Sequence, residues 1–208
     1  MKAVLVAVTL GAAVVVADPA LSLAAPAPPA GDYRLDINHT SVNFRISHLG
    51  FSHYTARFTR MDGRLKFDPD HPANQSVEAT IDANSIQTNY VGPPKLDFDA
   101  QVGREFLHAA EHPQITFRST KVDVTGANTA RVTGDLTLNG VTRPVTLETK
   151  FNGGWPRNAM DGARIGFSAH GAFRRSDFGI TYGLPAPGTN LGVGDEIEVI
   201  IETEFSAK

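Results

Sequence analysis

Three histidines, His39, His48 and His53, lie within one short stretch of the chain and are the first residues to consider for chemistry. Imidazole nitrogens bind transition metals and act as general acids and bases near neutral pH. Their spacing matches none of the common metal-site patterns, although two of them can approach each other across a β-hairpin. A metal-dependent hydrolase that uses these histidines is therefore one hypothesis. Ordinary hydrogen-bonded or surface histidines are the other.

Arg174 and Arg175 form the second candidate site, at the end of an alternating segment. Two neighbouring guanidinium groups can bind a phosphate or another anionic head group. A salt bridge from one arginine to Asp177 or a neighbouring residue is the simpler alternative, with Phe178 packed beside it as a plug. His48 shares a strand face with apolar residues, so its ring can bond either a ligand head group or a backbone carbonyl.

Several other classes of chemistry find no support in the sequence. Cys is absent, which excludes disulfides and thiolate metal sites. There is no G-x-S-x-G motif, and the glycine-rich stretch 183–194 lacks the Lys-Ser/Thr pair of a phosphate-binding loop. A net charge of −3 leaves no basic excess for nucleic acid. We therefore expect no enzymatic activity, no cofactor, no bound metal and no nucleic-acid partner.

The segment from Arg131 to Phe151 is expected to form a β-hairpin around which the fold is organised. Apolar residues alternate on both sides of Asn139-Gly140, a dipeptide that favours a two-residue type I′ turn. This turn fixes the register and places Gly134 opposite Val145, on the face that carries most of the apolar side chains. Gly134 leaves room on that face, either for close packing or for a ligand.

The rest of the chain past residue 31 is mostly a succession of strands. Alternation runs through residues 33–37, 42–48, 61–67, 77–81, 163–173 and 197–205. A change of phase near Thr120 predicts a β-bulge, and Gly153-Gly154 predicts a break. Residues 95–107 approach helical spacing, which favours one helix, either a cap on a barrel mouth or an ordinary crossover. The pattern predicts an all-β fold: an antiparallel β-barrel of about eight strands with one helical insertion.

The N-terminus predicts export. Lys2 is followed by an apolar run from Ala3 to Val16, shorter than the ~20 residues of a membrane span, and then by small residues. This is typical of a signal peptide that is cleaved after Ala24, with Ala25 or Ala30 as alternatives, or retained as an anchor. The expected organisation is a signal peptide over 1–24, an Ala/Pro-rich tether over 25–31 and a barrel domain over 32–206.

Several motifs, taken in order, resemble the YceI-like family. Each is weak alone, and their order and spacing over about residues 32–205 make the resemblance specific. They are YRLDINHTSVNFRISHLGFSHYTARF (33–58), MDGRLKFDP (61–69), EATIDANSIQTN (78–89), HPQITFRSTKV (112–122), VTGDLTLNGVTRPVTL (132–147), IGFSAHGAFRRSDFGI (165–180) and GDEIEVIIETEF (194–205).

This resemblance implies an extended lipocalin-like barrel, exported from bacteria to the periplasm or secreted, that holds a long isoprenoid in its interior. The expected function is that of a carrier, scavenger or stress-protection protein for an isoprenoid or similar amphiphilic lipid. A homodimer, and a membrane that donates or accepts the lipid, stay open as partners. The expected head-group contacts are His48, Arg174 and Arg175. The expected tunnel wall consists of Phe44, Ile46, His48, Phe58, Phe67, Ile81, Phe98, Phe106, Ile115, Phe117, Gly134, Leu136, Val145, Leu147, Ile165, Phe167, Phe173 and Phe178.

One segment departs from the family pattern. Where family members usually carry an acidic residue followed by His-Leu, this chain has Ala100-Gln101. A role of that histidine cannot be carried over, so the chemistry of the mouth and the ligand are left open here. A third hypothesis is a stress-related interaction module whose barrel is filled with side chains. Twelve Phe and a single Trp indicate an apolar interior without deciding whether it is hollow.

Overall fold

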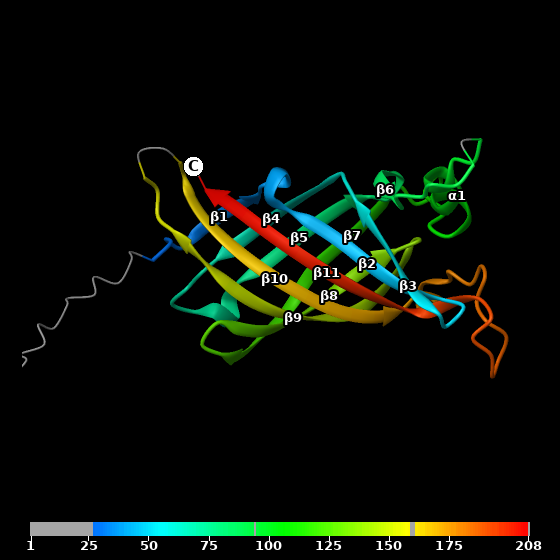
Figure 1. Ribbon diagram of the computed structural model, residues 1–208. Helices are drawn as coiled ribbons and strands as arrows, with labels where there is room; N and C mark the ends of the chain where they lie inside the picture. The colour runs from blue at the N-terminus through cyan, green and yellow to red at the C-terminus, as the bar shows by residue number, and fades with distance from the viewer. Residues whose placement is uncertain (1–26, 94, 159–160, 208) are drawn as a thin grey trace, which may run out of the picture.

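The computed structural model describes residues 27–93, 95–158 and 161–207, which form an elongated β-barrel (Figure 1). The predicted signal peptide over residues 1–24 lies outside these described residues. No helix within them is long and apolar enough to cross a membrane. Within the described parts of the chain there are eleven strands and one α-helix: β1 (Gly31–Leu35), β2 (Ser41–His48), β3 (Ser52–Phe58), β4 (Met61–Phe67), β5 (Ser76–Asp82), β6 (Ile86–Gln87), α1 (Phe98–Glu105), β7 (Gln114–Gly126), β8 (Thr129–Leu138), β9 (Val141–Trp155), β10 (Ala163–Arg174) and β11 (Val193–Ala207).

These strands occupy eight positions around a closed antiparallel barrel, as the sequence predicts. β1 and β2 lie end to end along β11, separated by a short 3₁₀ helix, η1 (Ile37–His39). β3 and β4 are likewise consecutive, and so are β5 and β6. The remaining order, β5-β7-β8-β9-β10-β11, closes because β11 pairs with β1. Closure leaves the ring without a free sheet edge.

The β8–β9 hairpin has the predicted register. Asn139 and Gly140 both adopt positive φ, at 51° and 72°, as a type I′ turn requires. Gly134 pairs with Val145, and each inward residue faces another inward residue except where Leu136 faces Arg143. The local chemistry of two turn residues therefore sets the alignment of two long strands.

Two irregularities bend the long strands. The register of β7 against β8 shifts between Ser119 and Lys121, which confirms the bulge predicted near Thr120. The predicted break at Gly153-Gly154 is wrong, because β9 continues to Trp155. The pairing with β10 instead shifts there by one residue, with Gly153 at a φ of 134°. Glycine accommodates this backbone conformation, so the strand bulges instead of ending.

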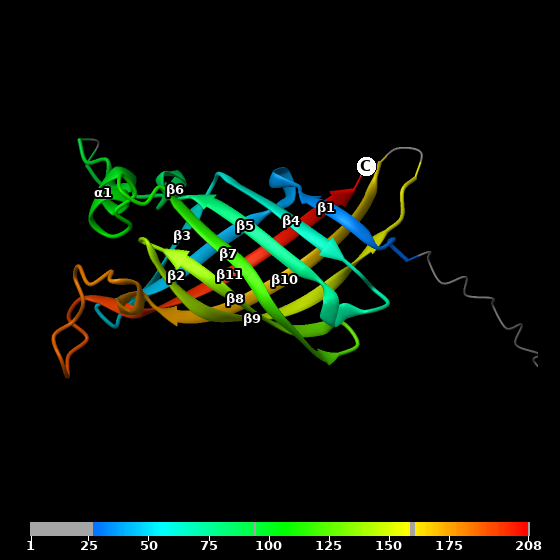
Figure 2. The same ribbon diagram turned by 180° about the vertical axis from the view of Figure 1, so that it is seen from behind.

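Helix α1 is shorter than the predicted 95–107 segment and lies at one end of the barrel. Asp97 caps it, since its Oδ1 accepts a hydrogen bond from the backbone N–H of Ala100 at 2.9 Å. Figures 1 and 2 show α1, the loop 179–192 and the tip of the β2–β3 hairpin at the same end, which we call the helical end. The opposite end, which we call the turn end, carries the β7–β8 turn and the 3₁₀ helix η2 (Pro72–Asn74) that packs against β7.

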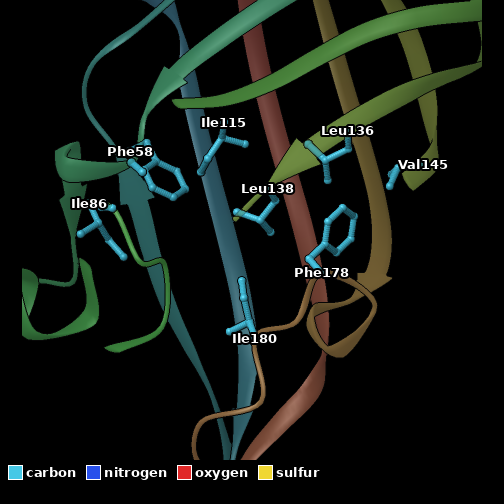
Figure 3. Close-up of a cluster of buried hydrophobic side chains, with 10 residues drawn as sticks. Phe58, Ile86, Ile115, Leu136, Leu138, Val145, Phe178 and Ile180 are labelled. Carbon is cyan, nitrogen blue, oxygen red and sulfur yellow. The ribbon is translucent and has the colours of Figure 1, made fainter. Parts of the chain in front are cut away.

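Buried apolar side chains gather in two clusters. The first lies toward the helical end and includes Phe58, Leu138, Phe178 and Ile180 (Figure 3). The second lies toward the turn end and is built around Tyr33, Phe67 and Phe205. Between and around these clusters the inward side chains leave space, and that space is the candidate site.

Candidate functional site: an apolar barrel cavity

The barrel interior holds a cavity of about 810 Å³. Its wall runs from α1 at the helical end to the β7–β8 turn at the turn end, and it is formed almost entirely by aliphatic and aromatic side chains. The volume lies in the upper part of the range of ~300–1,000 Å³ typical of small-molecule pockets. The interior is hollow, so the hypothesis of a barrel filled by its own side chains does not fit.

Most of the predicted wall residues do line this cavity. They come from strands all around the barrel and from α1, because alternation sends every second strand residue inward. Whether they contact a ligand stays a prediction. The predicted residues in the wall are Phe44, Ile46, His48, Phe58, Phe67, Ile81, Phe98, Phe106, Ile115, Phe117, Leu136, Val145, Leu147, Phe167 and Phe173.

Gly134 does not form the notch that would admit a ligand. A Cβ atom placed there would collide with the ring of Phe117 and lie 2.6 Å from the carbonyl oxygen of Arg118. The ring of Phe117 therefore covers the glycine, and Phe117 itself faces the cavity. Gly134 allows the close approach of a neighbouring strand, which was the alternative reading of the position.

Ile165 and Phe178 are also absent from the wall. Ile165 is inward but lies wholly within the turn-end cluster beside Phe205, so other side chains separate it from the cavity. Phe178 belongs to the 3₁₀ helix η4 (Arg175–Phe178) and packs edge-on against Phe173, with ring centroids 5.2 Å apart. Figure 3 places Phe178 among the buried residues below Leu136 and Val145. The predicted plug is present, but as part of the core.

Helix α1 supplies the wall at the helical end through Phe98, Val102 and Phe106. The helix is attached through Asp99, whose Oδ1 accepts hydrogen bonds from the backbone N–H and the hydroxyl of Thr88 at 2.8 and 2.5 Å. Thr88 in turn accepts a hydrogen bond at its carbonyl oxygen from the Tyr54 hydroxyl at 2.9 Å. Of the two predicted roles, α1 therefore has that of a cap on the barrel mouth.

Arg175 is buried, with 2% of its surface exposed, and its guanidinium holds the helical end together. It donates to four backbone carbonyls: Nε to Gly194 at 2.8 Å, Nη1 to Ile180 at 3.2 Å and Tyr182 at 2.8 Å, and Nη2 to Val193 at 2.8 Å. Burial lowers the pKa of the guanidinium, opposed by the nearby Asp195 carboxylate.

Arg175 also lines the cavity, and four hydrogen bonds from its guanidinium hold both ends of the loop 179–192. A head-group contact for Arg175 stays a prediction. Arg175 forms no salt bridge with Asp177. Asp195 is the carboxylate close by, and it accepts from the backbone N–H and hydroxyl of Ser176 at 2.9 and 2.8 Å.

The other two head-group candidates separate. Arg174 is exposed, lies on the outward phase of β10 opposite Glu196 and does not line the cavity, so its head-group contact stays a prediction that the geometry does not support. His48 ends β2 at the helical end, lines the cavity and is exposed to solvent there. A head-group contact for His48 stays a prediction.

The three histidines do not form a common site. His48 lines the cavity, His53 lies on the outward phase of β3, and His39 lies outside the barrel in η1. Within residues 27–93, 95–158 and 161–207, the side chains of Asp36, His39 and Glu204 are the one set close enough together to hold a metal.

The guanidinium group of Arg164 already occupies that cluster. Arg164 Nη1 lies 2.7 Å from both the Asp36 and the Glu204 carboxylates. Hydrogen bonds from His39 and Arg164 lower the pKa of Asp36 to about 2. The cluster is therefore an ion-pair network that connects the β1–β2 junction to β10 and β11. Because only His39 belongs to it, it does not support a hydrolase that uses all three histidines.

Sequence reasoning missed several cavity residues. Tyr54 and Ala56 line the cavity with Phe58, and their alternation with it along β3 is the signal that indicates their inward direction. Gln75 and Asn128 at the turn end belong to turns, for which periodicity gives no inward direction. Ala100 and Gln101, where the chain departs from the family pattern, do not line the cavity, and Gln101 donates to Glu105 at 3.0 Å on the helix itself.

Comparisons with known proteins agree with the fold and cover nearly the whole barrel. The model of the YceI-like domain family matches residues 33–205. A UPF0312 protein of Enterobacter sp. (strain 638) is 43% identical over 178 residues, covering 84% of this chain and 86% of that protein. Protein YceI of Salmonella arizonae is 42% identical over the same length and coverage.

Solved structures give the same answer. BcnA of Burkholderia cenocepacia superimposes with a TM-score of 0.67 at 25% identity, covering 82% of this chain and 98% of that one. A polyisoprenoid binding domain from Saccharophagus degradans, implicated in plant cell wall breakdown, has a TM-score of 0.58 at 16% identity, covering 85% and 98%. This domain shares the fold of the present chain. Because the family model matches nearly the whole barrel and two relatives are more than 40% identical to it, this chain belongs to the YceI-like family.

Proposed function

We propose that this protein binds one long apolar chain, an isoprenoid or a similar amphiphilic lipid, inside the barrel, and carries or sequesters it outside the cytoplasm without catalysis. The hollow, almost wholly apolar interior is the observation that carries the proposal. Membership of the YceI-like family supports it, as does the shared fold with a polyisoprenoid binding domain. The scattered histidines favour binding over a metal-dependent reaction.

The apolar character of the cavity wall argues for an apolar occupant. Apolar surface that packs against nothing loses its dispersion contacts, and apolar surface in contact with water is unfavourable. Water is a poor filler, because it needs several polar partners and this wall offers few.

An apolar chain is a better filler. Each buried methylene contributes ~0.8 kcal/mol. Ten buried carbons therefore give ~8 kcal/mol, against an association cost of ~4 kcal/mol or more. Affinity of this kind needs no dedicated polar residue, so shape selects the length of the chain. This agrees with the absence of a sharp ligand motif in the sequence.

Export is part of the proposal and rests on the N-terminal sequence. The apolar run Ala3–Val16 and the small residues up to Ala24 are typical of a cleaved signal peptide. The expected mature protein begins at Ala25. The intact mass of the protein recovered from the extracytoplasmic fraction measures this, and a full-length mass in the membrane fraction would instead indicate an uncleaved anchor.

Two alanines on β10 give a matched test of binding in the barrel. Ala169 lines the cavity, whereas Ala172, three residues further on, is exposed on the outer face. Ala169→Trp should fill the middle of the tunnel and weaken the binding of a fluorescent fatty-chain probe at least about tenfold, a change of ~1.4 kcal/mol. Ala172→Trp adds the same side chain outside and should leave binding unchanged.

Displacement of the probe by a polyprenol measures the natural class of ligand in both variants. Circular dichroism first confirms that each variant is folded. Equal affinity of a folded Ala169→Trp variant and the unchanged protein would show that the chain does not bind in the barrel. Probe binding that no polyprenol displaces would retain the cavity but reject the isoprenoid.

A further inference from the structure

Exposed apolar side chains gather at the helical end of the barrel. Val91, Phe51 and Leu191 are 98%, 84% and 73% exposed, and Tyr90, Tyr182 and Leu96 are about half exposed. They come from three segments: the β2–β3 tip (49–52), the segment before α1 (88–93, with Leu96 just beyond) and the loop 179–192. Figures 1 and 2 show all three segments at the same end.

Contacts hold these segments against one another. The backbone N–H of Leu49 donates to the carbonyl of Gly192 at 2.8 Å, which joins the hairpin tip to the loop. The rings of Tyr182 and Phe106 pack edge-on, with centroids 4.9 Å apart, which joins the loop to α1. Tyr90 lies against Phe98 at 4.8 Å. The exposed apolar residues therefore form one surface, which we call the apolar rim.

The apolar rim carries little charge. Residues 49–52, 88–93 and 179–192 contain no Asp, Glu, Lys or Arg, although these residues make up 20% of the chain. Exposed Lys95 and Asp97, of opposite charge, lie beside Leu96. Charged side chains are costly inside a bilayer, whereas tyrosine is favoured at its interface. The turn end differs, because Lys121 forms an ion pair with Asp123 there and His71 lies 3.4 Å from the carboxylate of Asp68.

The apolar rim is also continuous with the cavity. Tyr90 is both exposed on the rim and part of the cavity wall, next to Phe98 and close to His48 and Tyr54 at the same end. A lipid that leaves a bilayer for the barrel can follow apolar surface all the way through this end. Three separate tips, each with one to three large side chains, can enter a fluid interface without requiring a complementary rigid partner.

We propose that the apolar rim docks on the surface of a neutral lipid bilayer and that the lipid ligand passes between membrane and barrel at this end. This inference rests on the proposed function for the identity of the cargo, while docking itself is a separate property. Because the rim has no cluster of basic residues and Lys95 beside it is balanced by Asp97, binding depends on apolar insertion and not on anionic lipids.

Co-sedimentation with phosphatidylcholine vesicles tests the docking. The protein is first checked by mass for the loss of residues 1–24, because the apolar run Ala3–Val16 would bind vesicles by itself. The double variant Phe51→Asp, Leu191→Asp places two charges on the rim and should weaken vesicle binding at least about tenfold. Trp155→Asp, at an exposed aromatic residue of the turn end, is the matched control and should bind as the unchanged protein does.

Two further measurements separate the possible failures. Raising the salt concentration should change vesicle binding by less than about twofold, because screening acts on charges. Polyprenol offered in detergent micelles should enter the double variant normally, since neither Phe51 nor Leu191 lines the cavity.

Vesicle binding that the double variant retains, or that the unchanged protein lacks, overturns the docking proposal even if polyprenol is taken up. A dimer that the double variant dissociates, without vesicle binding, would assign the rim to a second copy of the chain. Vesicle binding without any uptake of polyprenol would instead reject the proposed cargo.

Discussion

The two ends of the barrel meet the solvent in different ways. At the helical end, a buried arginine and a capping helix hold together segments that are uncharged and expose large apolar side chains. At the turn end, the polar residues Gln75, Asn128 and Thr129 line the cavity beside Val124 and Ala127, and Lys121 pairs with Asp123. Five aromatic rings, of Tyr33, Phe67, Phe151, Phe167 and Phe205, interlock in that half of the barrel.

This difference suggests a division of roles along one continuous wall. The turn end owes its stability to packed rings, as a closed core does. The helical end has ring contacts too, such as Phe106 with Tyr182, but its loop is held in addition by hydrogen bonds from one buried side chain. Substitutions that affect one end of the barrel and not the other therefore test whether the two ends have these different roles.

The largest effect is expected from Arg175 at the helical end. Arg175→Ala leaves four carbonyls without their donor, each of which costs ~1 kcal/mol or more, so we expect a loss of at least ~4 kcal/mol in the free energy of unfolding. Urea denaturation measures it. Arg175→Lys offers fewer donors and should lose an intermediate amount.

Arg174→Ala is the matched control, one residue away and exposed, and should change the free energy of unfolding by no more than ~0.5 kcal/mol. Similar losses for Arg174→Ala and Arg175→Ala would contradict the role given to the buried guanidinium.

A somewhat smaller effect is expected from Phe67 at the turn end. Its ring lies 5.8 Å from that of Tyr33 and 5.9 Å from that of Phe151. Phe67→Ala should cost ~3 kcal/mol, near the lower limit for such a change, because the ring already borders a cavity. Phe51→Ala, at the helical end, removes an exposed ring and should cost little. Comparable losses from both variants, in the same urea series, would abolish the distinction between the ends.

The smallest effect concerns pH and the ion-pair network outside the wall. Asp36 accepts hydrogen bonds from His39 and Arg164, which lower its pKa from 3.8 to about 2 in the folded protein. A depressed carboxyl pKa adds stability above pH 3.8, and this contribution disappears as the pH falls toward about 2.

Because the pairs are partly exposed, we expect only ~1 kcal/mol from this group. Asp36→Asn should flatten the dependence of the unfolding free energy on pH between pH 4 and pH 2 by that amount. A variant whose pH profile matches that of the unchanged protein would show that Asp36 is not held in its charged form.

The sequence predicts the residues of the cavity wall well, because the direction of a strand side chain depends on residues close to it in the chain. Asn139-Gly140 determines a turn, and alternation then decides which side chains face inward. The change of phase at Thr120 likewise reveals a bulge without any knowledge of the neighbouring strand. These features need only the chain's own dihedral preferences and periodicity.

The failures concern residues whose role depends on distant partners. Gly134 is on the correct face, yet its neighbour Phe117 comes from another strand and covers it. The role of Arg175 as a tether depends on carbonyls of a loop with no periodic pattern, so the sequence does not reveal it. Phe178 is large and apolar, as a plug requires. It is buried in the core, however, where its ring packs against that of Phe173.

The central claim is that the cavity holds one apolar chain, and native mass spectrometry tests it most directly. The protein is sprayed from solution as purified and again after incubation with excess polyprenol, and the bound molecule is extracted and weighed. We predict a complex with one lipid per chain in at least one of these samples, retained by the protein without detergent. Protein that is free of lipid as purified and still unshifted in mass after incubation with polyprenol would contradict the account.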